Sequence, residues 1–142
     1  GKITGVAPTF FNVDGVLFEE CTEFVFTETM RQRKQKMEEL SDVFVMLPGG
    51  IGTLDEFFEI FTLKQLGRHG KPVGVLNTGG YYDGLLAMLD KMATEGFMLP
   101  ECRDILVVSN SPEELVKKLE AEYEQNAPAT VHKNIRGISE GR

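Results

Sequence analysis

The chain has 142 residues, 42% hydrophobic and 26% charged, which is the size of one globular domain with a sizeable core. Its formal net charge of −7 argues against general nucleic-acid binding, because the average surface would repel a phosphate backbone. Cys21 and Cys102 lack the spacing of a disulfide framework or a zinc site, and no apolar run approaches the roughly 20 residues that span a bilayer. We therefore expect a soluble cytoplasmic protein with no metal, membrane or nucleic-acid partner.

Apolar runs bounded by Gly, Pro and polar residues predict five strands. They are expected at Ile3–Pro8, Thr22–Thr27, Val43–Leu47, Pro72–Asn77 and Ile105–Ser109. Segments of helix formers with capping residues predict four helices. These are expected at Met30–Leu40, with Thr27 or Thr29 as its cap, and at Thr53–Leu66, Tyr81–Glu95 and Pro112–Gln125.

Strands that alternate with helices, several of them apolar throughout, predict an α/β fold with a parallel sheet and helices on both faces. We expect one domain over residues 1–125 and a loose polar C-terminal tail over residues 126–142. The chain starts at Gly1 without a Met and enters a predicted strand by Ile3. We therefore expect that an N-terminal portion, with its strand or strands, is missing.

The stretch DVFVMLPGGIGTLDEFFEIF (42–61) joins a predicted strand, buried on both faces, to a helix that is expected to begin at Thr53. Gly49, Gly50 and Gly52 permit a sharp turn between them. Such a turn points N–H groups and the positive end of a helix at one spot, which suits a phosphate. The turn matches neither the Walker loop nor the dinucleotide fingerprint, since the Gly-Lys-Ser/Thr of the first and the third glycine of the second are absent.

The predicted helix Met30–Leu40 carries basic residues in its first two turns and glutamates near its end. This order opposes the helix dipole, at a cost of about 0.3 to 1 kcal/mol for each badly placed charge. Arg33 lies within the apolar stripe of this helix, and Lys34 borders it. Arg33 is therefore either a buried residue paired with a structural carboxylate or an anion-binding residue.

The helix after the glycine turn has apolar residues around most of its circumference. They are Leu54, Phe57, Phe58, Ile60, Phe61, Leu63 and Leu66. A second subunit is the simplest cover for the surplus, which predicts a homodimer or a larger homo-oligomer. The alternative is a cover within the same domain, supplied by the missing N-terminal portion.

Glu56 has two interpretations. Thr53-Leu54-Asp55-Glu56 matches a capping box, in which the glutamate only bonds the N–H of the cap. A carboxylate in the first helical turn beside a phosphate pocket would instead be ionised and suited to stabilise positive charge or to act as a base. Glu59, one turn on, could assist it or face solvent.

Three other side chains carry weaker signals. His69 lies in a basic, glycine-flanked turn and is interpreted as an ordinary loop residue. Tyr81 and Tyr82 follow a second glycine turn and could stack on a base, although packing in the core is the simpler expectation.

PGGIGTLDE (48–56), with MRQRK (30–34) upstream, resembles the motifs PGGxGTxxE and MxxRK of the LOG (Lonely Guy) family of nucleotide phosphoribohydrolases. The match continues through QLGRHGKPVGVLN (65–77) and GYYDGLL (80–86). The resemblance implies a Rossmann-like fold and dimers or larger assemblies. It also implies release of a free base and ribose 5-phosphate from a nucleoside monophosphate, such as a cytokinin ribotide or AMP, without a cofactor.

Carried over by motif, the resemblance places the catalytic pair at Arg33 and Glu56. The same carry-over assigns phosphate contacts to Gly49, Gly50, Gly52 and Thr53, and possible substrate contacts to Met30, Lys34 and Glu59. The chain lacks the N-terminal strand, the cysteine-containing turn and the second glycine-rich turn that help to build the nucleotide pocket in this family.

Two other functions remain to be separated from hydrolysis. A non-catalytic nucleotide-binding module would use the same loop and would bind AMP without turnover. A decarboxylase, a label often attached to such sequences, would carry coloured pyridoxal phosphate, and the chain has no recognisable lysine motif for it.

Overall fold

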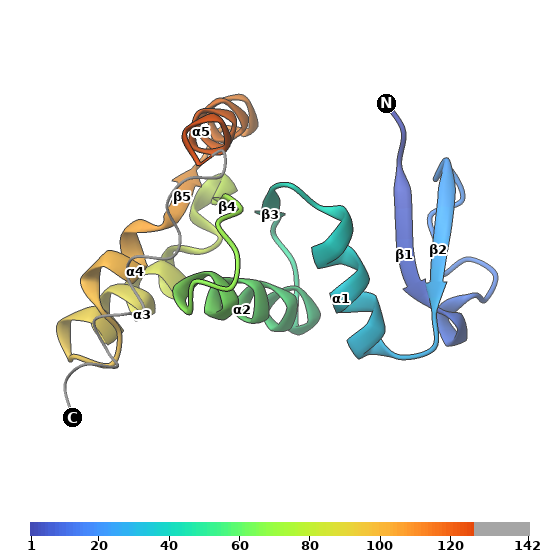
Figure 1. Ribbon diagram of the computed structural model, residues 1–142, viewed down its shortest axis with the longest axis horizontal. Helices are drawn as coiled ribbons and strands as arrows, with labels where there is room; N and C mark the ends of the chain where they lie inside the picture. Colours follow the sequence, from blue (N-terminus) through green and yellow to red (C-terminus); the bar gives the residue numbers. More distant parts are fainter. Residues whose placement is uncertain (127–142) are drawn as a thin grey trace. The chain divides into compact units, whose positions relative to one another are not determined.

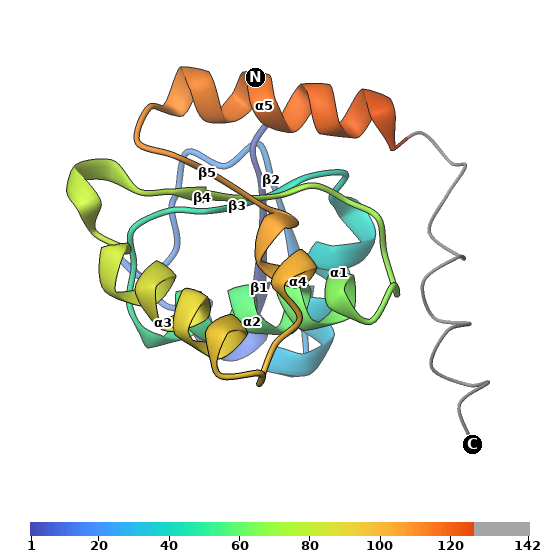
Figure 2. The ribbon, with the colours of Figure 1, turned by 90° about the vertical axis from the view of Figure 1, so that its left-hand side faces the viewer.

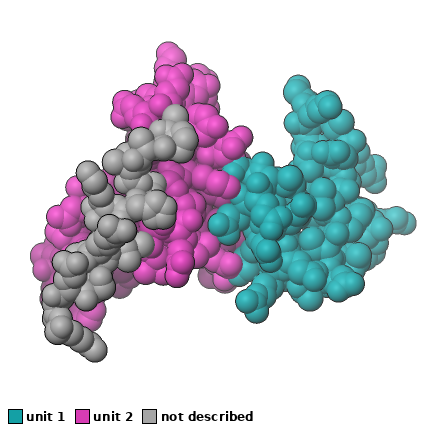
Figure 3. Space-filling model, in the orientation of Figure 1, with its two compact units in different colours: residues 1–41 teal, residues 42–142 magenta. Residues whose placement is uncertain are grey.

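The computed structural model describes residues 1–126, which form an α/β protein of parallel strands and helices (Figure 1). The chain divides into two compact units, residues 1–41 and the residues from Asp42 onward (Figure 3). The expected α/β class is confirmed, with the strands arranged in two parallel sheets flanked by helices. A single domain over residues 1–125 stays a prediction, and the predicted tail, apart from Asn126, lies outside the described residues.

The first unit is a pair of parallel strands with one long helix against it. Its elements are β1 (Thr4–Pro8), the short 3-10 helix η1 (Thr9–Phe11), β2 (Glu23–Thr27) and α1 (Met30–Leu40). Gly5 lies opposite Phe24 in the ladder, and a Cβ at Gly5 would overlap the Phe24 ring. The Phe24 ring thus packs directly on Gly5, and this contact holds β1 and β2 together.

Local signals define α1, and its predicted bounds are confirmed. The Thr29 hydroxyl accepts from the N–H of Gln32 at 3.2 Å, while the Gln32 side chain accepts from the N–H of Thr29 at 3.2 Å. This capping box selects Thr29, rather than Thr27, as the cap. At the other end the Ser41 hydroxyl donates to the Met37 carbonyl at 2.6 Å.

The second unit is a three-stranded parallel sheet in the order β3-β4-β5, with helices on both faces. Its elements are β3 (Phe44–Met46), α2 (Ile51–Gln65), β4 (Val73–Leu76), the 3-10 helix η2 (Thr78–Gly80), α3 (Asp83–Thr94), α4 (Pro100–Asp104), β5 (Leu106–Ser109) and α5 (Pro112–Gln125). Figure 2 shows α5 on one face of this sheet and α2, α3 and α4 on the other. The core lies under α2 and α3, where Phe57, Phe61 and Leu89 meet Val75 of the central strand.

The predicted burial of β3 on both faces is wrong. Met46 is buried in the core, but Val45, which points to the other face, is 44% exposed. The reason is that α5 lies against β4 and β5 and leaves the face of β3 uncovered. The short helix α4 is also an addition to the predicted elements, and α3 begins at Asp83, because Gly79 and Gly80 take left-handed backbone angles just before it.

His69 is more than the loop residue that its sequence context indicates. It is only 9% exposed, and its Nδ1 accepts from the N–H of Lys71 at 3.2 Å. Its Nε2 lies 2.9 Å from the carbonyl oxygen of Ile60 and therefore carries the proton in the neutral ring. His69 thereby joins the second half of α2 to the segment just before β4.

Among residues 1–126, no helix is long and apolar enough to cross a membrane.

A side chain at Gly74 should destabilise the second unit. An added Cβ would lie 2.8 Å from Cδ1 of Leu119 and 3.1 Å from Cδ1 of Leu115, two buried residues of α5. Overpacking of this kind costs about 1 to 3 kcal/mol, so Gly74→Ala should lower the free energy of unfolding by that amount in urea titrations. Gly84→Ala in α3 is the control, because nothing lies within 4 Å of its added Cβ. Equal stability of the two variants would contradict the packing described for α5.

Candidate functional site

The turn between β3 and α2 has the strand, glycine turn and helix start expected of a phosphate site. Gly50 is the N-cap of α2, with extended backbone angles and no side-chain cap. The first helical bond runs from the N–H of Leu54 to the carbonyl of Gly50 at 3.2 Å. The N–H groups of Ile51, Gly52 and Thr53 therefore have no acceptor within the helix and mark its positive end.

The start of α2 corrects the predicted helix boundary. Thr53 is the third residue of α2, because the helix already begins at Ile51, and so Thr53 is not its cap. Glu56 then lies in the second turn, where a capping box has no place for it. The interpretation of Glu56 as part of a capping box is therefore wrong, since Gly50 offers no side chain to reciprocate.

The three glycines of the turn have different surroundings. A Cβ at Gly49 would lie 2.9 Å from the Cβ of Thr53, so the close approach of loop and helix requires glycine there. At Gly50 and Gly52 an added Cβ would meet nothing within 4 Å. The turn is thus tightly packed at Gly49 and open at Gly50 and Gly52, and Ile51 between the latter two is 82% exposed.

Two tyrosine hydroxyls bind backbone carbonyls at the glycine turn. The Tyr81 hydroxyl donates to the carbonyl of Gly49 at 2.8 Å, and the Tyr82 hydroxyl donates to the carbonyl of Leu47 at 2.6 Å. Their rings meet edge to face, with centroids 4.9 Å apart. Tyr82 is 3% exposed, in line with core packing, whereas Tyr81 is 58% exposed. The sequence did not predict that the hydroxyls of Tyr81 and Tyr82 would bind the glycine turn. The signal available in the sequence was that both glycine turns are expected at the same edge of the sheet.

A buried amide fixes the tyrosine pair. The side-chain oxygen of Asn77 accepts from the N–H of Tyr82 at 2.7 Å, and its nitrogen donates to Asp83 at 2.7 Å. Burial raises the pKa of the Tyr82 hydroxyl, against a smaller lowering effect of the Gly49 backbone. The neutral phenol that donates to Leu47 is therefore favoured well into the alkaline range.

The other predicted site residues lie on α1, in the first unit. The Nε of Arg33 donates to the carbonyl of Val6 at 2.8 Å, which orients the guanidinium against β1. Burial lowers the pKa of this group, although an arginine stays charged at neutral pH. Met30 is 38% exposed and Lys34 is half-buried. The bond to Val6 shows how Arg33 is tolerated in the core-facing stripe; its pairing with Glu56 stays a prediction.

The second unit brings together the three glycines, Thr53 and the two glutamates of α2. Glu56 follows Gly52 by four residues and Thr53 by three, so the three share one side of the helix. Glu56 is half-buried and Glu59 is exposed. Because side chains on a helix lean toward its N-terminus, we expect the Glu56 carboxylate on the side of the turn.

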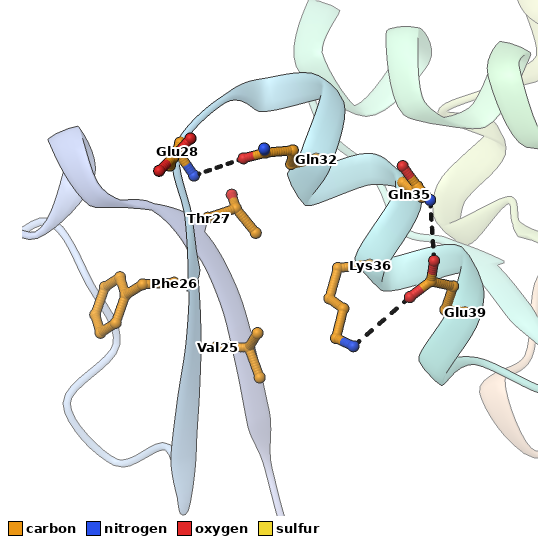
Figure 4. Close-up of a pocket in the computed structure, with 8 residues that line it drawn as sticks. All are labelled: Val25, Phe26, Thr27, Glu28, Gln32, Gln35, Lys36 and Glu39. Atoms are coloured by element: carbon orange, nitrogen blue, oxygen red, sulfur yellow. Dashed lines mark hydrogen bonds and ion pairs between the residues drawn. The ribbon is translucent and has the colours of Figure 1, made fainter.

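A separate, open pocket of about 360 Å³ lies between β2 and α1 (Figure 4). Its lining residues are Val25, Phe26, Thr27, Glu28, Gln32, Gln35, Lys36 and Glu39. Several of these polar groups bond one another: Gln32 accepts from the N–H of Glu28 at 2.8 Å, and Gln35 donates to Glu39 at 3.0 Å. The pocket includes none of the predicted site residues.

Within the part of the chain that the structure describes, no group of three or more His, Cys, Asp or Glu residues could hold a metal ion.

The described residues combine a parallel α/β fold with a glycine turn at a helix start, and comparison with known proteins gives the family of the chain. A family model described as "possible lysine decarboxylase" matches residues 1–119. The chain is 47% identical over 118 residues to cytokinin riboside 5'-monophosphate phosphoribohydrolase LOG1 of Arabidopsis thaliana, covering 83% of this chain and 55% of that protein. It is 43% identical over 131 residues to the probable phosphoribohydrolase LOGL2 of Oryza sativa subsp. japonica, covering 92% and 53%.

The chain belongs to this family, the LOG family. It spans about half the length of the curated relatives it matches.

The buried hydroxyl of Tyr82 should make stability depend on alkaline pH. A raised pKa in the folded state contributes stability that is fully present below the unfolded pKa of about 10 and is lost as pH rises above it. Near pH 8.5 we expect the free energy of unfolding of wild type, measured in urea, to exceed that of Tyr82→Phe by about 1 kcal/mol, because the variant lacks the bond to the Leu47 carbonyl. This difference in unfolding free energy should become smaller at about pH 10.5, because the tyrosine ionises more readily in the unfolded chain than in the folded protein. A constant difference across this range would contradict the burial of the hydroxyl.

Proposed function

We propose that the protein hydrolyses the N-glycosidic bond of a nucleoside 5′-monophosphate and releases a free base and ribose 5-phosphate. The observation that carries the proposal is the open turn at the start of α2, with the N–H groups of Ile51, Gly52 and Thr53 unused by the helix. The names of the relatives support a cytokinin ribotide as substrate. AMP has the same phosphate and ribose and is proposed as a second substrate.

In the proposed complex the turn from Gly49 to Thr53 holds the 5′-phosphate. Glu56, one helical turn further along α2, faces the sugar and stabilises the positive charge that develops as the bond from C1′ to the base breaks, or orients the attacking water. The hydroxyl of the water becomes bonded to C1′ of ribose 5-phosphate, and its other proton is taken up by the base as the bond between C1′ and the base nitrogen breaks. Glu59 assists from the next turn.

Arg33 supplies the positive charge that balances the phosphate and the carboxylate. Its Nε bond to Val6 orients the guanidinium, which suits a group that positions a nucleotide. Lys34 adds a second positive charge and Met30 an apolar contact. This arrangement also gives a reason for the basic residues at the start of α1, where the helix dipole disfavours them.

The active protein is proposed to be a cytoplasmic homodimer or larger homo-oligomer. The support comes from the two ends of α2, where Ile51 is 82% and Leu66 is 55% exposed, although Phe57 and Phe61 in its middle are buried within the chain. Light scattering of the intact protein measures the assembly directly; a monomer would remove this part of the proposal.

The names of the relatives favour hydrolysis over the two other functions considered from the sequence. Each relative reported above is a phosphoribohydrolase by name, while only the description of the family model mentions a decarboxylase. Calorimetry that shows tight AMP binding, together with chromatography that shows no release of base, would instead identify a nucleotide-binding module.

Glu56→Gln should abolish most of the activity of the intact protein. Removal of a charge that stabilises the transition state lowers kcat by about 10²- to 10³-fold. Chromatography of free base and ribose 5-phosphate from AMP and from a cytokinin ribotide measures the loss. Asp55→Asn removes the same charge from the neighbouring position and should retain activity. If Glu56→Gln cleaves as fast as wild type, the mechanism is wrong.

Arg33→Lys should lose at least about 10-fold in kcat/KM, because lysine keeps the charge but lacks the planar fork that binds a phosphate or carboxylate with two bonds. Arg31→Lys is the matched control, since Arg31 is exposed on the same helix. The proposal for Arg33 fails if both variants keep wild-type kcat/KM on AMP and on the cytokinin ribotide.

A further inference from the structure

Two peptide carbonyls at the glycine turn, those of Leu47 and Gly49, each accept a hydrogen bond from one tyrosine hydroxyl. Tyr81 reaches Gly49, 32 residues earlier in the chain, and Tyr82 reaches Leu47, 35 residues earlier. These bonds connect the turn that starts α2 with the turn that starts α3. The proposed catalytic groups include neither tyrosine.

The bond from Tyr81 determines the direction of one N–H group. No peptide bond among the described residues is cis, and in a trans peptide the C=O and the following N–H point in opposite directions. The carbonyl of Gly49 accepts from Tyr81, so the N–H of Gly50 points away from the tyrosine. Gly50 is the N-cap of α2, and its N–H belongs to the residue that immediately precedes Ile51, Gly52 and Thr53.

The bond from Tyr82 acts one step earlier. It binds the carbonyl of Leu47, and the next residue, Pro48, has no N–H to orient. Tyr82 thus anchors the end of β3, and Tyr81 sets the peptide that follows Gly49. Glycine peptides have the greatest conformational freedom, so a turn with three glycines keeps one arrangement only if contacts from outside hold it.

Each tyrosine has contacts of its own with the protein. Tyr82 is bound through its own N–H to Asn77, which also bonds Asp83. Gly79 and Gly80, at φ of 60° and 72°, shape the turn before them. Because the Tyr81 ring is 58% exposed, its hydroxyl bond and its edge contact with Tyr82, rather than burial of the ring, are its main links to the protein.

We propose that Tyr81 and Tyr82 are positioning residues of the phosphate site: Tyr81 orients the Gly49–Gly50 peptide so that the N–H of Gly50 joins the phosphate cradle, and Tyr82 fixes the end of β3. The inference rests on the proposed function. It extends that function by assigning the cradle a fourth N–H group and a support from the turn that precedes α3.

The test compares Tyr81→Phe with wild type in the intact protein, with AMP and adenosine as probes. Loss of the hydroxyl should weaken AMP binding by about 3- to 10-fold in calorimetry, as expected for one oriented hydrogen bond. Adenosine, which has no phosphate, should bind both proteins equally. Tyr123→Phe on α5 is the control for the same substitution at a half-exposed site, and it should leave both affinities unchanged.

A second measurement reads the turn directly and needs no turnover. In wild type, titration with inorganic phosphate should shift the NMR amide signal of Gly50, and in Tyr81→Phe the same titration should require several-fold more phosphate. An unchanged Gly50 titration in Tyr81→Phe overturns the inference, as does an equal loss of AMP and adenosine binding. Absence of any phosphate response at Gly50 in wild type overturns it as well.

The cleavage assay separates this inference from the proposed function. Phosphate binding that depends on Tyr81, without release of base from either nucleotide, keeps the inference and rejects hydrolysis. Release of base with an unchanged KM for AMP in Tyr81→Phe keeps hydrolysis and rejects the inference.

Discussion

The passage from β3 to α2 within four residues is the constraint on which the candidate site depends. So sharp a turn cannot satisfy its own peptide groups: the carbonyls of Leu47 and Gly49 need donors, and the first N–H groups of α2 need acceptors. The protein supplies donors for the carbonyls through Tyr81 and Tyr82. The N–H groups remain on the open side over Gly50 and Gly52. The turn thus has donors for these two carbonyls, and its first helical N–H groups are the ones proposed to bind the phosphate.

The packing of the second unit explains how this turn is held in place. The central strand β4 carries Gly74 where α5 approaches, and it ends at Asn77, whose side chain binds the tyrosine turn. His69 joins Ile60 in the second half of α2 to Lys71 just before β4, so contacts near β4 hold this half of the helix, while the tyrosine turn after β4 holds the turn at its start. Small residues and single polar groups therefore set the geometry, while the phenylalanines of α2 supply the buried area of the core.

Charge is arranged against local stability on α1 and in favour of it on α5. Basic residues open α1 and no acidic residue occupies its first turn, whereas Glu113 and Glu114 occupy the first turn of α5, as the helix dipole prefers. Arg33 is tolerated in the inward stripe of α1 because its Nε bonds the Val6 carbonyl. The net charge of −7 would repel a phosphate, and Arg33 and Lys34 are proposed to supply the local positive charge that binding a nucleoside monophosphate requires.

The sequence by itself determined the elements that depend on local signals. The bounds of α1 and α5 follow from their helix formers and from capping residues before them, although only the structure chose Thr29 over Thr27 as the cap of α1. The parallel α/β class follows from the order of the apolar runs. The glycine motif PGGIGTLDE located the candidate site in the chain and indicated the family. Only the tertiary structure decided where α2 begins, which face of β3 is exposed, and what His69 and the tyrosine hydroxyls bind. α2 begins directly after Gly50, which has no capping side chain to mark the start in the sequence. The exposed face of β3 follows from the position of α5, and the bonds of His69 to Ile60 and of the tyrosine hydroxyls join residues that lie 9 to 35 positions apart, so no local pattern encodes them.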